Sequence, residues 1–236
     1  MSIGIGNCSL GFVPRVALAI ADDVNPAQVN ECLAGGVDLV EFRVDQFEDN
    51  SVENSCTYLK AFSDISSIGT IRSKKEGGNW SGDEKARCAL YKEIIPFVNA
   101  VDIEIGASDI VDDVVKKAKQ SDVTVIGSYH NFVNTPMPDV LTGILEEGKD
   151  LGVDIVKIAT HCANADDLCT LTQFLVNHPE EPLIVIGMGA SGGPSRIFFP
   201  FLGSLITYTF LGSPSAPGQF GWEETLTLIK KVSFER

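Results

Sequence analysis

Short apolar segments rich in β-branched residues recur along the chain, and most are separated by stretches with apolar residues at helical spacing. Runs of this length and composition are typical of buried strands. They cover residues 16–20, 39–44, 68–72, 101–105, 124–130, 155–159, 183–188 and 205–210. The pattern therefore predicts eight strands.

The intervening stretches predict helices. Pro26 stands where a first helical turn is expected, and Leu90, Tyr91, Ile94 and Ile95 recur at helical spacing. The predicted helices cover residues 26–34, 84–98, 110–119, 138–151, 166–176, 195–202 and 223–231. Strand–helix alternation of this kind predicts an α/β fold, a closed (β/α)8 TIM barrel, built as a single domain from residues 1–236.

An open doubly wound sheet is the alternative fold. Such sheets usually carry a glycine-rich phosphate-binding turn after the first strand. Residues 21–25, which follow the first predicted strand, contain no glycine. The sequence therefore favours the barrel.

Composition narrows the class of protein. Hydrophobic residues make up 44% of the 236 residues, enough for a large core, and the net charge of −14 disfavours binding to nucleic acid or to anionic membrane. No window of about 18 uncharged apolar residues predicts a membrane helix, and no signal peptide is apparent at the start. The six cysteines show neither paired nor metal-ligand spacing, so we expect reduced thiols in a cytoplasmic protein.

Lys157 interrupts the apolar strand predicted at 155–159. Lysine is seldom buried without a partner, and burial favours its neutral amine, which attacks carbonyl groups and forms Schiff bases. The plainer interpretation is that Lys157 is exposed at the strand end or paired with an acid. This segment alone leaves both interpretations open.

Other polar side chains gather at the carboxyl ends of the second to seventh predicted strands, where barrel enzymes build their active sites. Because alternate strand residues share a face, Glu41 and Arg43 point into the barrel if Val40 and Phe42 pack on helices. By the same alternation, the side chains that point inward on the other strands are those of Thr70, Arg72, Asp102, Glu104, Ser128, His130 and Lys157.

Each of these features has a structural explanation when taken singly. Inward Glu–Arg pairs often neutralise each other, a single histidine at a strand end is commonly structural, and glycines after strands form turns. Together, however, Lys157, Arg43, Arg72 and Arg196 converge on one mouth. This surplus of positive charge predicts an anionic substrate, and it also favours a neutral lysine.

Six blocks of sequence, in order along nearly the whole chain, resemble the type I 3-dehydroquinate dehydratase family, the Schiff-base dehydratases of the shikimate pathway. The blocks read EFRVD at 41–45, TIR at 70–72 with EGG at 76–78, SYHNF at 128–132, DIVKIA at 154–159, MGASGGPSR at 188–196 and SAPGQ at 215–219. The resemblance implies a (β/α)8 barrel that uses no metal and no organic cofactor. It also implies a homodimer.

The resemblance further implies a hydro-lyase that converts 3-dehydroquinate to 3-dehydroshikimate in chorismate and aromatic amino acid biosynthesis. Lys157 would form an imine with the C3 carbonyl. His130 would remove the C2 proton and then protonate the departing C1 hydroxyl, while Glu76 would orient His130.

The remaining residues of the family pattern would bind substrate. Glu41, Arg43 and Arg72 would hold the ring hydroxyls, Met188 would form an apolar wall, and Arg196 would bind the carboxylate. Ser215 and Gln219 would lie on a loop that closes over the substrate.

Two other functions are compatible with the residues alone. A Schiff-base aldolase-type lyase also needs a buried lysine on the sixth strand, although it usually binds phosphate near strands seven and eight. A non-catalytic anion-binding barrel would simply pair the lysine with an acid.

Overall fold

Eight parallel strands form one sheet within residues 3–11, 13–212 and 218–233, which are the residues that the computed structural model describes. The strands follow the order β10-β3-β4-β5-β6-β7-β8-β9. Their bounds are β3 (Arg15–Ile20), β4 (Leu39–Arg43), β5 (Ser67–Thr70), β6 (Ala100–Glu104), β7 (Thr124–Asn131), β8 (Ile155–His161), β9 (Leu183–Met188) and β10 (Ile206–Phe210). Each predicted strand is confirmed to within two residues at either end.

The sheet curves into a nearly closed barrel, with its seam between β9 and β10. There the backbone N–H of Leu205 donates to the carbonyl of Leu183 at 2.8 Å. The hydroxyl of Ser204 accepts from the N–H of Val185 at 3.0 Å. The predicted (β/α)8 barrel is thus confirmed, and the doubly wound alternative is set aside.

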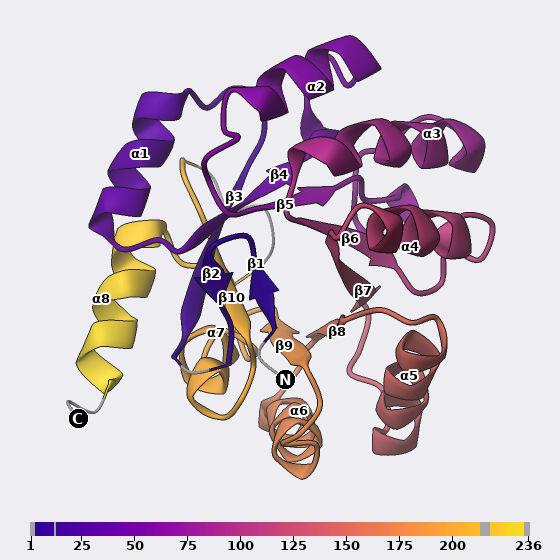
Figure 1. Ribbon diagram of the computed structural model, residues 1–236. Helices are drawn as coiled ribbons and strands as arrows, with labels where there is room; N and C mark the ends of the chain where they lie inside the picture. Colours follow the sequence, from indigo (N-terminus) through magenta and orange to yellow (C-terminus); the bar gives the residue numbers. More distant parts are fainter. Residues whose placement is uncertain (1–2, 12, 213–217, 234–236) are drawn as a thin grey trace.

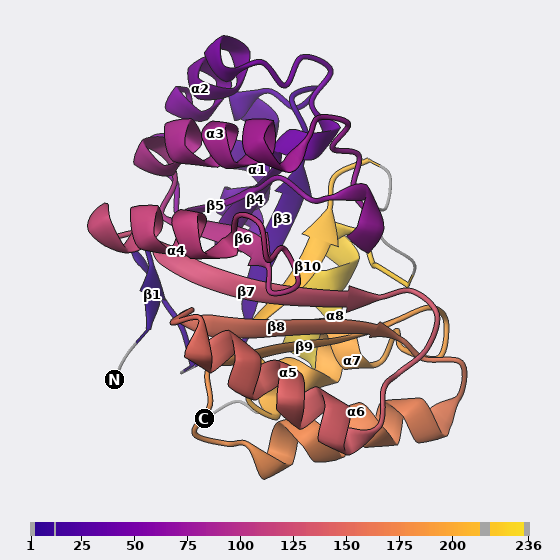
Figure 2. The same ribbon diagram turned by 90° about the vertical axis from the view of Figure 1, so that its right-hand side faces the viewer.

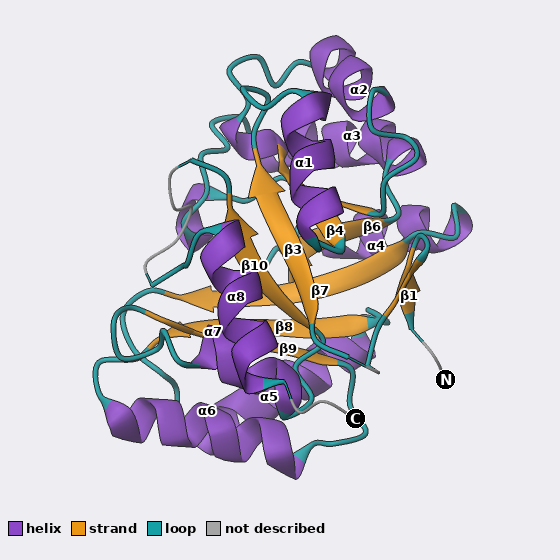
Figure 3. Cartoon of the chain, turned by 90° about the vertical axis from the view of Figure 1, so that its left-hand side faces the viewer, coloured by secondary structure: helices purple, strands orange, loops and turns teal. Residues whose placement is uncertain are grey.

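Helices surround the strands (Figures 1 and 3). The predicted helices correspond to α1 (Pro26–Gly35), α3 (Glu84–Ile94), α4 (Val111–Gln120), α5 (Pro138–Asp150), α6 (Ala165–Asn177), α7 (Ser195–Phe198) and α8 (Trp222–Val232). Within the described part of the chain, no helix has both the length and the apolar character to cross a membrane.

Two predicted helices are shorter than expected. The one predicted over 84–98 leaves the α conformation after Ile94 and continues as the 3₁₀ turn η3 (Ile95–Phe97). The one predicted over 195–202 is only the single turn α7, followed by the 3₁₀ turn η4 (Phe199–Phe201). Pro96 and Pro200 explain both breaks, because proline lacks the N–H that continues an α-helix.

One further helix, α2 (Val52–Lys60), was not predicted. Ser51 caps it by accepting from the N–H of Asn54. Only Ser55 and Leu59 are buried along its length, so its apolar stripe is too sparse to mark a helix in the sequence.

The strands separate two apolar layers, as the alternation predicts. Val40 and Phe42 of β4 pack outward with the helices. Leu39 of the same strand and Ile155 of β8 pack into the barrel interior. This arrangement places the polar residues on the inner face, above the interior apolar layer.

A hairpin of β1 (Gly4–Ile5) and β2 (Cys8–Ser9), also not predicted, closes the amino-terminal end of the barrel. Ile5, Cys8 and Leu10 belong to the interior apolar cluster. Figure 2 shows β1 at the opposite end from the arrowheads of β7 and β8. The carboxyl ends of the strands are therefore left to form a pocket.

Candidate active site

One pocket, of about 540 Å³ including its open mouth, lies at the carboxyl ends of the strands. Nine of the ten predicted site residues line it: Glu41, Arg43, Arg72, Glu76, His130, Lys157, Met188, Arg196 and Gln219. The tenth, Ser215, lies outside the described residues. The structure thus gathers residues from strands and loops around the barrel at one pocket.

Lys157 projects from β8 into this pocket and is only 5% exposed. Its Nζ lies 2.8 Å from Oδ2 of Asp102 and 3.7 Å from Oε1 of Glu41. The ring of Tyr208 covers it, with the centroid 4.1 Å from Nζ. Lys157 is therefore buried in the pocket and is also paired with an acid, and its role as a nucleophile stays a prediction.

Asp102, on β6, is the main counter-ion of the site. Its Oδ1 accepts from Nη2 of Arg72 at 2.6 Å, and its Oδ2 accepts from Lys157. Burial alone would raise the pKa of Asp102, but Arg72 and Lys157 lower it below its usual range. The carboxylate therefore stays ionised and can neutralise a positive charge on the lysine nitrogen.

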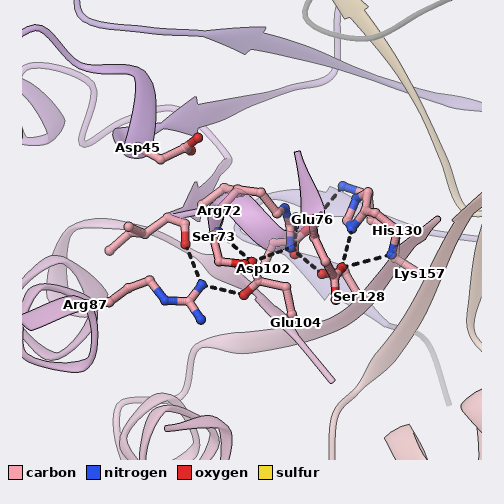
Figure 4. Close-up of polar contacts among 12 residues, drawn as sticks. Asp45, Arg72, Ser73, Glu76, Arg87, Asp102, Glu104, Ser128, His130 and Lys157 are labelled. Carbon is pink, nitrogen blue, oxygen red and sulfur yellow. Dashed lines mark hydrogen bonds and ion pairs between the residues drawn. The ribbon is translucent and has the colours of Figure 1, made fainter. Parts of the chain in front are cut away.

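His130 is fixed by Glu76 through one oxygen. Oε2 of Glu76 accepts from the backbone N–H of His130 and contacts its Nδ1, both at 2.9 Å (Figure 4). Ionised Glu76 places the imidazole proton on Nδ1 and leaves Nε2 as the basic nitrogen. Glu76, on the turn after β5, thus sets the tautomer of His130 on β7.

The two members of this pair have shifted pKa values. Burial, together with the positive charges of Arg72 and Lys157, holds the pKa of His130 well below its usual range. Burial raises the pKa of Glu76 to about 7, against the opposing charge of Arg72. At neutral pH the imidazole is therefore neutral, and Glu76 titrates within the working range.

Arg72 connects the two sides of the pocket. Besides Asp102, its guanidinium donates to the hydroxyl of Ser128 at 2.6 Å through Nη1. Although burial opposes it, the charges of Asp102 and Glu104 hold the pKa of Arg72 well above its usual range. Arg72 is a permanent positive charge at 3% exposure.

Glu41 and Arg43 leave β4 on its inner face, as predicted. Oε1 of Glu41 accepts from the hydroxyl of Thr70 at 2.8 Å. Arg43 forms a two-pronged pair with Asp45, whose distances are 3.0 and 2.8 Å. Asp45 also accepts from the backbone N–H of Asn79 at 3.0 Å, which ties the loop after β5 to this arginine.

Arg196 reaches the pocket from α7 and is 3% exposed. Burial lowers the pKa of Arg196 to about 10, so it is protonated at neutral pH. The loop before it is tightly folded: Ser195 Oγ donates to the carbonyl of Gly192 at 2.7 Å and accepts from the N–H of Gly187 at 2.8 Å.

Gln219 comes from the loop after β10. The neighbouring Gly218 has φ +77°, and a Cβ there would lie 2.6 Å from the carbonyl oxygen of Gly189. Because a side chain would not fit, glycine lets this loop approach the loop after β9, which brings Gln219 to the same pocket as Arg196. That the loop closes over substrate stays a prediction, since residues 213–217 lie outside the described part.

Sequence reasoning placed Asp102 on the inner face but did not include it among the site residues, and it missed Tyr208, Phe132 and Ile186 in the pocket wall. The signal for Asp102 was its place between the strands of Arg72 and His130. Tyr208 shares its strand face with Ile206. Because the pattern of β10 is that of an apolar strand, it did not mark Tyr208 as a pocket residue.

Comparisons with known proteins agree along nearly the whole chain. A family model described as type I 3-dehydroquinase matches residues 18–232. The 3-dehydroquinate dehydratase of Thermodesulfovibrio yellowstonii is 37% identical over 220 residues, which cover 92% of this chain and 95% of that protein.

Solved structures give the same result. The 3-dehydroquinate dehydratase of Aquifex aeolicus is 33% identical, with a TM-score of 0.83 over 92% of this chain and 98% of that one. The type I enzyme of Clostridium difficile, solved with covalently modified comenic acid, is 26% identical, with a TM-score of 0.88 over 98% of each chain.

Proposed function

The chain belongs to the type I 3-dehydroquinase family and eliminates water from 3-dehydroquinate, and we propose that Lys157 and His130 divide the chemistry of this reaction between them. The enzyme is a hydro-lyase, and its product is 3-dehydroshikimate, an intermediate of the shikimate pathway. Membership of the family decides against the aldolase-type lyase and the non-catalytic binding barrel.

Lys157 opens the reaction by attacking the C3 carbonyl of the substrate. The hydroxyl of the carbinolamine takes up a proton from solvent and leaves as water, so that a protonated imine remains on Nζ. Asp102, 2.8 Å from this nitrogen, offsets the positive charge of the imine within the buried pocket. The structure of the Clostridium difficile enzyme, which holds covalently modified comenic acid, agrees with a covalent step in this family.

His130 carries out the elimination. The protonated imine withdraws electrons from C2, so a weak base is sufficient to remove the C2 proton. Nε2 of His130 accepts it, and the electron pair of the C2–H bond is held in the enamine. Because the low pKa of His130 makes its imidazolium a strong acid, it readily protonates the C1 hydroxyl as the C1–O bond breaks. Hydrolysis of the imine then releases the product and returns the amine.

The other pocket residues hold the anionic substrate. Arg196 binds the carboxylate, because a guanidinium can fork onto its two oxygens. Glu41, Arg43 and Arg72 hold the ring hydroxyls. Met188 forms an apolar wall, while Gln219 and Ser215, the latter outside the described residues, complete the mouth.

The observation that carries this proposal is that a 5%-exposed amine and a neutral histidine oriented by Glu76 line one pocket. Borohydride reduction in the presence of 3-dehydroquinate tests it. The reduced adduct is expected on the peptide that contains Lys157, and the Lys157→Met variant should give none. Labelling at another lysine, or no labelling of the active enzyme, would refute the assignment.

We also propose that the enzyme is a cytoplasmic homodimer. The six cysteines are all free, which agrees with a reducing compartment. Val133, Met137 and Val140 expose 83%, 74% and 50% of their surface near the start of α5, so this apolar group is suited to be covered by a second subunit. Sedimentation equilibrium tests the oligomer, and a Val133→Asp/Met137→Asp variant should weaken it.

A further inference from the structure

Arg87 is a fully buried charged side chain that the mechanism above does not use. It stands on α3, outside the barrel, and is 1% exposed. Its Nη1 donates to Oε2 of Glu104 at 2.5 Å and to the carbonyl of Ile71 at 2.9 Å. Its Nη2 donates to Glu84 at 2.6 Å, at the edge of the helix. A buried guanidinium is costly unless its partners are in place, so each contact constrains the position of its acceptor.

Glu104 transmits this constraint to the turn that carries Glu76. While Oε2 of Glu104 is held by Arg87, its Oε1 accepts from the backbone N–H of Ser73 at 2.7 Å. Ser73 opens the 3₁₀ turn η2 (Lys74–Glu76), and its carbonyl accepts from the N–H of Glu76 at 3.1 Å. The position of Glu104 therefore fixes the base of the turn from which Glu76 holds His130.

Glu104 is also linked to the lysine side of the pocket through Arg72. Its Oε1 lies 3.6 Å from Nη1 of Arg72, and Arg72 binds Asp102, which binds Lys157. The result is a row of alternating charges from the surface of α3 to the pocket: Glu84, Arg87, Glu104, Arg72, Asp102 and Lys157. Figure 4 shows its buried members.

We propose that Arg87 is a positioning residue for the dehydration, acting through Glu104 on both the Glu76–His130 pair and the Arg72–Asp102–Lys157 group. Without Arg87, Oε2 of Glu104 loses its donor, and Arg72 is the nearest cation that can turn toward it. That movement loosens Asp102 on one side and the Ser73 turn on the other. The inference rests on the roles proposed above for Lys157 and His130.

The test begins with Arg87→Met, which keeps the length of the side chain and removes its charge. We expect kcat for 3-dehydroquinate to fall by about tenfold or more, because small displacements of catalytic groups are costly. KM should change less than kcat, since the charge row includes Arg72, which holds a ring hydroxyl, but not Arg196, the proposed carboxylate ligand. The matched control is Lys92→Met, on the same helix as Arg87. It breaks an exposed ion pair with Asp113 of α4 and should leave kcat unchanged.

The acid limb of the plot of kcat/KM against pH distinguishes a positioning role of Arg87 from a general structural defect. The charged groups that face Glu76 are Arg72, just after β5, and Asp102 and Glu104 of β6, and the titratable His130 of β7 also contacts it. In Arg87→Met, Arg72 is drawn toward Glu104 and stabilises ionised Glu76 less, so the limb moves to higher pH. In Glu104→Gln a like charge is lost, so the limb moves to lower pH.

A double-mutant cycle completes the test. If Arg87 acts through Glu104, the double variant Arg87→Met/Glu104→Gln should turn over no more slowly than Glu104→Gln alone. Arg87→Lys should keep an intermediate kcat, and it carries the test if Arg87→Met does not fold. Any of three results would overturn the inference: unchanged kcat in both Arg87 variants, additive losses of kcat in the double variant, or a fall in kcat with no shift of the acid limb. Borohydride trapping at Lys157 in the unaltered enzyme reports on the proposed function separately.

Discussion

A single carboxylate oxygen of Glu76 serves both the backbone amide and the Nδ1 of His130, at 2.9 Å each. The main chain and the side chain of the histidine are thus held by one group. Because burial raises the pKa of that carboxyl to about 7, the state of the histidine depends on pH within the physiological range.

We expect kcat/KM to fall about tenfold per pH unit below about pH 7. There Glu76 becomes protonated and donates to Nδ1, which puts the imidazole proton on Nε2 and removes the base. The Glu76→Gln variant has no such titration, so its lower activity should lack this limb. A pH–rate profile of the unaltered enzyme that stays flat from pH 8 to 5 would contradict the assignment.

The same pKa predicts an effect on stability. The folded-state pKa of Glu76 lies above the unfolded value, so protonated Glu76 favours folding at low pH. That contribution is lost as the pH rises from about 4.5 to about 7, at a cost of about 3 kcal/mol. Denaturant unfolding of Glu76→Gln across this range should show a smaller decline than the unaltered enzyme.

Replacing His130 should separate imine formation from elimination. His130→Ala retains Lys157, so borohydride should still trap the substrate, while turnover falls by about 10²–10⁴-fold. His161→Ala and His178→Ala are the controls, and both should keep near-normal turnover. Near-normal turnover in His130→Ala would show that another group is the base.

Asp102→Asn should destabilise the enzyme strongly. It leaves the buried Arg72 and Lys157 side chains without the carboxylate between them, and breaking such a buried pair costs about 3–5 kcal/mol. Turnover should also fall, because the protonated imine loses its counter-ion. The exposed Asp113→Asn change is the control for chemical denaturation, and it should leave stability unaltered.

Arg196→Lys should raise KM by about 10- to 100-fold, because an ammonium cannot replace a guanidinium forked onto the substrate carboxylate. Gln219→Ala should have a milder effect, below about tenfold. Steady-state kinetics with 3-dehydroquinate checks both. Equal KM values in Arg196→Lys and the unaltered enzyme would place the carboxylate elsewhere.

Gly192→Ala should cost about 1–3 kcal/mol of stability and weaken substrate binding. A Cβ there would lie 2.4 Å from the carbonyl carbon of Gly187, so the loop that carries Arg196 would have to shift. Gly143→Ala on α5 is the matched control: nothing lies within 4 Å of its added Cβ, and it should stabilise the protein by about 0.5–1 kcal/mol. Thermal unfolding compares the two.

The barrel and most of the pocket follow from sequence because strand alternation is strict. Placing Val40 and Phe42 against helices necessarily turns Glu41 and Arg43 inward. Similar logic brings His130 and Lys157 to one mouth. The family resemblance supplied the roles of these residues, which the alternation alone left open.

Features that depend on contacts distant in sequence were not predictable. Asp102 owes its importance to Arg72 and Lys157, which lie 30 and 55 residues away. Arg87 looks like any arginine on an amphipathic helix until the fold places Glu104 beside it. The helix predicted over 195–202 was too long for a local reason. Pro200 allows only one α turn, α7, where two were expected.

The hairpin at the amino-terminal end determines how the enzyme exchanges its small molecules. Ile5, Cys8 and Leu10 fill that end with apolar atoms, so within the described residues the pocket opens toward the strand ends. Substrate and product then use one passage, and 3-dehydroshikimate has to leave before another 3-dehydroquinate binds. Product inhibition should accordingly be competitive, and the water that hydrolyses the imine has to arrive from the side on which the ligand sits.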